Sequence, residues 1–301
     1  MAVASDPAEQ PPHVTVLLHE AVELLQVRDG GLYVDGNLGF GGHSSEILAL
    51  GGQVIGFDWD DLALAQAEKR LARWSDKVRL VRRNFAELSQ VLAEEGVAAV
   101  DGILLDLGLS SMQLADEERG FSFQGDQPLD MRMDSRLLTS GADLVNSASQ
   151  EELADILYYY GEERQARPIA AAIIARRQKA GAITSTAELV EVIKSAVPRR
   201  YYPKKIHVAT RSFQALRIAV NQELDNLATI LREGPALLKP GGRLVIISFH
   251  SLEDRLVKKK FRDEKLLQVV TRKPLLPSAA ECSRNPRARS ARLRAAERRA
   301  E

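Results

Sequence analysis

The stretch Tyr33-Val-Asp-Gly-Asn-Leu-Gly-Phe-Gly-Gly-His-Ser-Ser-Glu46 decides the fold of this 301-residue chain. It begins as a short apolar strand, passes through a loop with four glycines and continues into a helix. Glycine permits backbone conformations and close approaches that a side chain would block, so a ligand can lie against such a loop at the N-terminus of a helix. These glycines are Gly36, Gly39, Gly41 and Gly42.

The spacing of the glycines weighs against a nicotinamide cofactor. The dinucleotide fingerprint is G-x-G-x-x-G, and Ser44 stands where the third glycine would follow Gly39 and Gly41. The expected second strand ends at Asp58, about twenty residues past the loop, where a carboxylate can accept hydrogen bonds from both ribose hydroxyls. Dinucleotides and S-adenosyl cofactors both use such an acid. Both classes stay open on these residues alone, and a purely structural turn is the alternative.

Length and composition predict a soluble protein with a substantial core. The chain is 45% hydrophobic and has equal numbers of basic and acidic residues, 41 of each. Its one cysteine, Cys282, lies far from any Cys or His cluster, so neither a disulfide framework nor a metal site is expected. No segment has the pattern of a signal peptide or a membrane span. A cytoplasmic protein without membrane contact is predicted, and its oligomeric state is not predicted.

The order of expected elements predicts an α/β fold with a doubly wound, mostly parallel, Rossmann-like sheet. Between the fourth and fifth strands the pattern becomes helical for about one hundred residues, which predicts an inserted all-helical domain. We expect a discontinuous sheet domain over residues 1–108 and 211–301, and the insert over 109–210. The expected strands are 32–34, 54–57, 78–81, 102–105 and 243–249, and helices are expected at 63–74, 151–159, 163–179, 185–196 and 211–231.

Asp106 stands at the end of the expected fourth strand. In open parallel sheets the ligand crevice lies outside the carboxyl ends of the strands, so Asp106 should share one site with the glycine loop and Asp58. Two other segments are strongly basic. Residues 198–207 interleave four cations with two tyrosines, and residues 284–299 carry seven arginines against one glutamate. Cations beside aromatic rings suit phosphate contact and base stacking, although a solvated loop or tail is the alternative for each.

Nine blocks of this sequence resemble the bacterial MraW family, and the resemblance extends from about residue 13 to residue 298. It implies an S-adenosylmethionine-dependent methyltransferase that modifies N4 of a cytidine in the decoding region of 16S ribosomal RNA, in the small ribosomal subunit. The blocks are residues 13–18 (HVTVLL), 41–43 (GGH), 101–111 (DGILLDLGLSS), 118–123 (ERGFSF), 128–134 (PLDMRMD), 161–164 (GEER), 209–214 (ATRSFQ), 248–254 (SFHSLED) and 285–290 (NPRARS).

The resemblance also implies roles for matching positions. It assigns cofactor contacts to Gly41, Gly42, His43, Asp58, Phe85, Asp106 and Gln113. Taken alone, Phe85 would more often be a core aromatic, Gln113 a surface loop residue and His43 a helix-capping or packing residue. Asn37, Pro168 and Val208 depart from the residues that are usual in the family, and none of the three is an assigned cofactor residue.

The reaction requires a group that takes a proton from the amine after methyl transfer. Asp106 is the first candidate for that role and His250 the second. Two other functions stay open on the sequence. One is an amino-methyltransferase that acts on another RNA or on DNA, although the Pro-Pro-aromatic signature of the DNA enzymes is missing after Asp106. The other is a non-catalytic scaffold that binds the ribosome, which predicts loss of the pocket residues.

Overall fold

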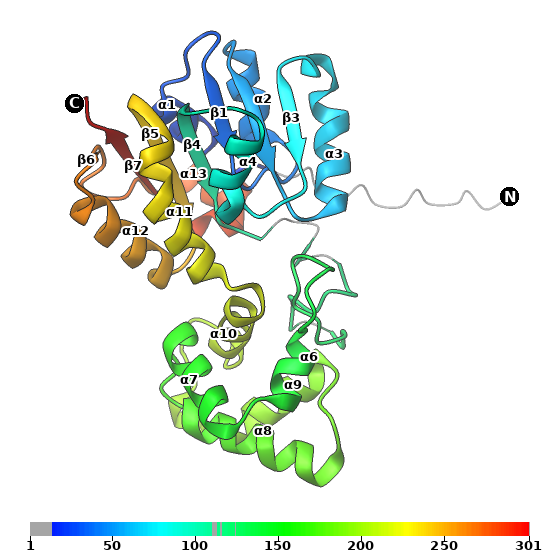
Figure 1. Cartoon of the computed structure of the whole chain (residues 1–301). Coiled ribbons are helices and arrows are strands. Elements are labelled where there is room, and N and C mark those ends of the chain that lie inside the picture. The colour runs from blue at the N-terminus through cyan, green and yellow to red at the C-terminus, as the bar shows by residue number, and fades with distance from the viewer. Residues whose placement is uncertain (1–13, 110–112, 115, 124, 301) are drawn as a thin grey trace, which may run out of the picture.

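The computed structural model describes residues 14–109, 113, 114, 116–123 and 125–300, so His13, Ser110 and Ser111 of the quoted blocks lie outside it. Its centre is a seven-stranded sheet with the order β3-β2-β1-β4-β5-β7-β6 (Figure 1). The first five strands are parallel, and β7 and β6 add an antiparallel edge. The predicted fold class is confirmed. The strands are β1 (Leu32–Asp35), β2 (Gln53–Phe57), β3 (Val78–Val81), β4 (Val100–Asp106), β5 (Leu238–Ser248), β6 (Leu267–Val269) and β7 (Arg292–Arg298).

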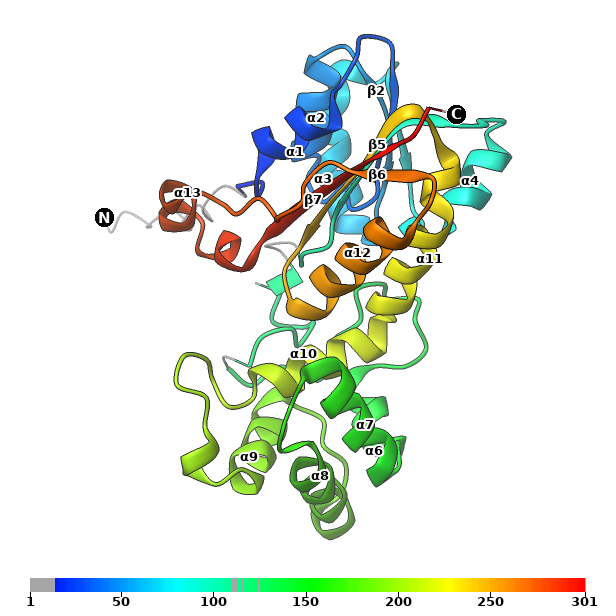
Figure 2. The same ribbon diagram turned by 90° about the vertical axis from the view of Figure 1, so that its left-hand side faces the viewer.

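Helices cover both faces of the sheet (Figures 1 and 2). Successive side chains of a strand point to opposite faces, and both faces are apolar here. Tyr33 and Leu104 pack with the helices of one face, while Val34 and Ile103 pack with those of the other. The first group of helices is α1 (Leu18–Leu25), α2 (Gly42–Ala49) and α3 (Asp61–Leu71), and the second is α4 (Leu88–Glu94), α11 (Glu223–Leu237) and α12 (Ser251–Asp263).

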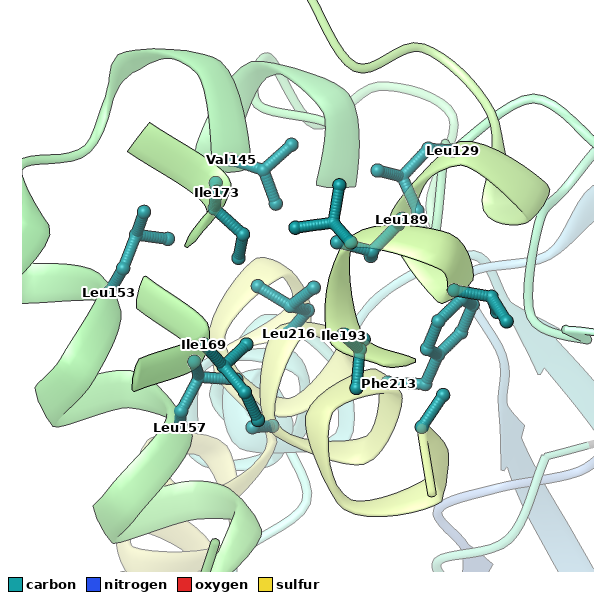
Figure 3. Close-up of a cluster of buried hydrophobic side chains, with 14 of the residues drawn as sticks. Leu129, Val145, Leu153, Leu157, Ile169, Ile173, Leu189, Ile193, Phe213 and Leu216 are labelled. Atoms are coloured by element: carbon teal, nitrogen blue, oxygen red, sulfur yellow. The ribbon is translucent and has the colours of Figure 1, made fainter. Parts of the chain in front are cut away.

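Most of the chain between β4 and β5, up to the end of α10, forms a separate helical unit with its own core (Figures 1 and 3). Leu157, Ile173, Ile193 and Leu216 come from four different helices and are fully buried together. The helices are α6 (Gly141–Ser147), α7 (Gln150–Gly161), α8 (Ala166–Ala180), α9 (Thr186–Ala196) and α10 (Thr210–Asn221). The expected domain boundary at residue 210 falls at the start of α10, which packs against α7.

Capping residues explain where two of the predicted helices begin. Ser149 accepts a hydrogen bond from the backbone N–H of Glu152, whose side chain accepts one from the backbone N–H of Ser149. Ser185 and Glu188 make the same reciprocal pair at the start of α9. Each pair satisfies two backbone donors that a helix terminus leaves free.

The single helix predicted over residues 211–231 is wrong. Gln222 has a left-handed backbone with φ of 51°, which ends α10 and lets α11 begin at Glu223. A left-handed backbone conformation at a non-glycine residue is rarely predicted from sequence, because this conformation is uncommon and mildly strained. The break lets α10 join the helical unit while α11 packs on the sheet (Figure 2).

The basic C-terminal segment is in part a strand. Residues 292–298 form β7, which pairs with β5 inside the sheet. The strand predicted over residues 243–249 begins earlier, because β5 already starts at Leu238. Other short helices are η1 (Ala72–Trp74) after α3, η2 (Phe85–Glu87) after β3, η3 (Arg199–Tyr201) after α9, and α13 (Ala279–Arg284) with η4 (Pro286–Ser290) before β7. Within the described ranges, no helix is both long enough and apolar enough to cross a membrane.

Candidate functional site

A cavity of about 500 Å³ opens at the carboxyl ends of the parallel strands. This is the position at which open α/β sheets hold their ligands. The sheet domain and the inserted segment both contribute to it, because Leu109, Gln113 and Met133 of the inserted segment also line the cavity. The strand ends supply residues 36–40 after β1, Asp58 and Trp59 after β2, 83–85 after β3, 106–109 at β4, and Phe249 with Glu253 after β5.

The glycine loop forms one wall of this cavity. The backbone N–H of Gly36 donates to the carbonyl of Leu104 at 2.8 Å, which ties the loop to β4. Gly41 has φ of 73°, a left-handed conformation that favours glycine, and it precedes the first residue of α2. A Cβ on Gly42 would lie 1.8 Å from Oγ1 of Thr15, so the loop and the segment before α1 pack without room for a side chain.

Asp58 holds the loop in place and lines the cavity. Its Oδ2 accepts a hydrogen bond from the backbone N–H of Gly39 at 2.9 Å, and its Oδ1 accepts one from the backbone N–H of Asp60 at the same distance. Burial raises the pKa of Asp58 to about 7. Each carboxylate oxygen still has a lone pair for a ligand hydroxyl.

Two further carboxyl groups lie at the ends of the central strands. Asp35 accepts a hydrogen bond from the hydroxyl of Ser44 at 2.7 Å, and burial raises the pKa of Asp35 to about 6. Burial, then the negative charges of Asp35 and Glu253, raise the pKa of Asp106 to about 8. Oδ1 of Asp106 and Oδ1 of Asn37 are both buried without a hydrogen-bond partner among the described residues. Both residues line the cavity, so it presents acceptors for a polar, positively charged ligand.

Six of the predicted cofactor residues come together around the cavity: Gly42, His43, Asp58, Phe85, Asp106 and Gln113. Gly41 does not line it and acts on it through the conformation of the loop. His43 lies with Nε2 3.2 Å from the carbonyl of Val16, and the side-chain amide of Gln113 donates to Asp60 at 3.3 Å. These contacts give both side chains fixed positions at the wall.

His250, the second candidate proton acceptor, does not line the cavity. It caps α12, and its Nδ1 accepts the backbone N–H of Glu253 at 3.5 Å. The residue that reaches the cavity is Glu253, which the sequence analysis missed. The signal that could have found it is the capping-box spacing, which places an acid three residues after the cap and at the end of β5.

Glu253 belongs to a small cluster with His250 and Glu223, in which one possible ligand atom of each lies within 4.8 Å of the others. Two observations weigh against a cation there. Arg217 already makes two hydrogen bonds to Glu223, at 2.7 and 2.8 Å. Because Nδ1 of His250 accepts a backbone N–H, the neutral imidazole carries its proton on Nε2, the nitrogen that faces Glu253.

Comparison with known proteins identifies the family. The family model described as "MraW methylase family" matches residues 10–299. The chain belongs to the MraW methylase family. A similar protein, Ribosomal RNA small subunit methyltransferase H of Desulfotalea psychrophila, is 53% identical over 95% of this chain and 97% of its own length. The protein of the same name from Cyanothece sp. is 50% identical over 97% of each chain.

Among solved structures, the putative rRNA-methylase of Clostridium thermocellum is similar at a TM-score of 0.47 and 14% identity, over 95% of this chain and 98% of its own.

The methylase described here is S-adenosylmethionine-dependent, and its cavity suits that cofactor. S-adenosylmethionine supplies an electrophilic methyl carbon on a positively charged sulfur. The carboxylate of Glu253 and the unpartnered oxygens of Asn37 and Asp106 match its cationic groups, and Asp58 matches its ribose hydroxyls.

Cofactor affinity should rise with pH. Without ligand, the raised pKa values of Asp58 and Asp106 keep a share of both groups neutral near pH 7. A cationic ligand favours their ionised forms, so binding releases protons and strengthens as pH rises through these pKa values. Calorimetry should show affinity for S-adenosylmethionine increasing by about tenfold between pH 6 and pH 8.5.

S-adenosylhomocysteine is the matched control ligand, because it has the same adenosine but no sulfonium charge. Its affinity should change less over the same pH range. Asp101, at the opposite end of β4, is the control position, and Asp101→Asn should leave both pH profiles unchanged. An S-adenosylmethionine affinity that is constant from pH 6 to pH 8.5 would contradict the electrostatic description of the cavity.

Proposed function

We propose that this methylase transfers the methyl group of S-adenosylmethionine to N4 of a cytidine in the decoding region of 16S ribosomal RNA, in the bacterial cytoplasm. The observation that carries the proposal is the convergence of Asp58, Asp106 and Glu253 on one cavity in a member of this family. The names of the relatives support a substrate in the small ribosomal subunit. An acidic cavity also suits an exocyclic amine, because carboxylates accept hydrogen bonds from cytosine N4.

The seven residues to which the family resemblance assigns cofactor contacts fit the binding of S-adenosylmethionine. Asp58 would hold the ribose, Phe85 would pack near the adenine, and Asp106 with Gln113 would complete the pocket. Gly41, Gly42 and His43 would shape the wall against which the donor lies. Positioning supplies much of the rate, because the N4 lone pair is delocalised into the ring and must be brought in line with the methyl carbon.

We propose that the inserted unit, residues 109–210 with α10, binds the RNA around the target nucleotide. Its basic segment runs from Arg199 to Lys205 and includes a short 3-10 helix (Arg199–Tyr201). The guanidinium of Arg200 lies 4.9 Å from the centre of the Tyr201 ring, and Tyr201 is half exposed. An exposed aromatic ring beside unburied cations suits stacking and phosphate contact.

Six of the seven arginines of residues 284–299 divide into two groups. Four of them hold the protein together: Arg292 and Arg294 pair with Asp254, and Arg298 and Arg299 donate to backbone carbonyls. Arg284 and Arg287 instead line the cavity, and no ion pair of either is found in the described part of the chain. These two are the better candidates for phosphate contact. Arg132 of the inserted unit is instead paired with Asp130 at 2.7 Å.

Charge reversal at Arg199 and Arg200 should weaken binding to the small ribosomal subunit by tenfold or more. Each lost phosphate contact lowers the salt dependence of affinity, by about 0.7 to 0.9 in the slope of log K against log salt. Filter binding over a salt series measures both quantities. The Arg73→Glu, Arg232→Glu double variant carries the same charge change on the sheet layer and should bind like the wild type. Equal affinities for all three proteins would reject this surface.

The proposed reaction can be tested with purified components. Small subunits from cells that lack the protein are incubated with S-adenosylmethionine labelled in the methyl group, and the RNA is digested to nucleosides. The expected product is labelled N4-methylcytidine, from one site in 16S RNA. Label in another nucleoside, or no label in RNA, would reject the proposed substrate.

A further inference from the structure

We infer that Glu253 is the group that holds the target amine and takes its proton, with His250 as the residue that positions it. This inference rests on the proposed function and names the recognition element for the base. It replaces His250 with Glu253 as the side chain that touches the substrate.

The geometry of Glu253 fixes one oxygen and leaves the other for a ligand. Oε2 accepts hydrogen bonds from the backbone N–H of Phe249 at 2.8 Å and of His250 at 3.3 Å. The side chain is 3% exposed and lines the cavity. Oε1 therefore has a defined position, because a carboxylate anchored through one oxygen cannot rotate without losing both backbone contacts.

His250 sits beside the free oxygen. Its Nε2 lies 3.1 Å from Oε1 of Glu253, but the two are not in hydrogen-bonding geometry, and Nε2 is buried without a hydrogen-bond partner among the described residues. A donor and an acceptor thus stand side by side at the end of β5. The imidazole limits where Oε1 can lie and is not itself part of the cavity lining.

Asp106 and Glu253 are assigned to two different groups: Asp106 to the positively charged group of the methyl donor, and Glu253 to the target amine. Asp106 ends β4 and pairs in register with Ile247 of β5, and Glu253 lies in the first turn of α12, just after β5. Both residues line the cavity, and the negative charge of Glu253 contributes to the raised pKa of Asp106. Oδ1 of Asp106 has no hydrogen-bond partner among the described residues, and β4, which Asp106 ends, pairs with the strand that precedes the glycine loop. Asp106 therefore matches the cationic group of S-adenosylmethionine. Glu253, one strand further away, is left for the amine.

Base selectivity follows from the same contact. Cytosine presents an N–H donor at position 4, which a carboxylate oxygen accepts. Uracil presents a carbonyl oxygen there, which would face Oε1 of Glu253 as a second acceptor and leave it unpaired. A fixed carboxylate at this position therefore favours cytidine over uridine without any further contact.

Glu253 accepts the proton that N4 must lose after methyl transfer. The N4 lone pair forms the new N–C bond while the C–S bond breaks and its electrons stay on sulfur. N4 then carries two protons, one methyl group and a positive charge. One proton passes to Oε1 of Glu253, which leaves neutral N4-methylcytosine and a neutral carboxyl group. Release of that proton to water restores the carboxylate.

The test uses Glu253→Gln in the full-length protein, because glutamine keeps an oxygen for the backbone contacts but removes the charge. We expect single-turnover methylation of small subunits to fall by about a hundredfold or more. Affinity for S-adenosylmethionine and the melting temperature should stay close to wild type. The matched control is Glu152→Gln, which changes the same capping-box position at the start of α7, far from the cavity.

A second readout does not depend on turnover. With S-adenosylhomocysteine bound, the wild type should prefer RNA with cytidine at the target position over RNA with uridine by about tenfold, and Glu253→Gln should reduce this preference to about twofold. A variant that methylates and discriminates like the wild type would overturn the inference and leave the proposed function standing. A wild-type protein that methylates a different base or atom would overturn both.

Discussion

Asp58→Ala is expected to weaken S-adenosylmethionine binding by about a hundredfold or more. In the proposed role, the Asp58 carboxylate would accept hydrogen bonds from the two ribose hydroxyls, and each charge-assisted hydrogen bond contributes about 1.5 to 3 kcal/mol. A loss of about 3 kcal/mol corresponds to about two orders of magnitude in the dissociation constant. Asp58 also accepts the backbone N–H of Gly39, so its removal frees the glycine loop. Isothermal titration calorimetry measures the change.

The control for this variant is three residues away. Asp61→Ala removes a carboxylate that is 59% exposed and pairs with Arg82 on the surface. Exposed ion pairs contribute little, so this variant should bind the cofactor like the wild type. Affinity of Asp58→Ala within threefold of wild type would show that the ribose is held elsewhere.

Asp254→Ala should lower the free energy of unfolding by about 3 to 5 kcal/mol. Asp254 joins α12 to β7 through Arg294, with Nε to Oδ1 at 2.6 Å, and through Arg292 at 3.0 Å. The Asp254 and Arg294 side chains are 11% and 7% exposed. Removing one partner of a buried pair leaves an uncompensated charge, which is why the cost is large. Urea unfolding followed by circular dichroism measures it.

Asp263→Ala provides the comparison, because that residue is near the other end of α12 and makes an exposed pair with Arg262. We expect a change of less than about 1 kcal/mol there. The larger loss in Asp254→Ala would identify the Asp254 pair as the attachment of β7. Equal losses in the two variants would contradict the burial argument.

The sheet and half of the site follow from simple patterns in the sequence. Apolar runs that alternate with amphipathic helices predict parallel strands, and the glycines, Asp58 and Asp106 follow three of them. Because the carboxyl ends of parallel strands meet at one edge, those residues had to come together. Phe85 and Gln113 lack such a local signal. Their predicted place at the cavity came from the family resemblance.

The errors have equally specific causes. β7 was missed because Arg292, Arg294 and Arg298 dominate its composition, while its apolar residues are only Leu293 and the two small residues Ala295 and Ala296. Its arginines are tolerated because acids and carbonyls of neighbouring elements pair with them, which a sequence does not display. Glu253 was missed, and His250 named instead, for a similar reason. Both lie at the start of one helix, and only the three-dimensional structure shows that Glu253, held by two backbone N–H groups, lines the cavity while His250 does not.

Nucleoside mass spectrometry of 16S RNA from cells that lack this protein tests the proposed reaction most directly. We expect N4-methylation of one decoding-region cytidine to disappear, to return when the wild-type gene is restored, and to stay absent when the Asp58→Ala gene is supplied. A cytidine that keeps its N4-methyl group in the absence of the protein would contradict this proposal by showing that another enzyme methylates it.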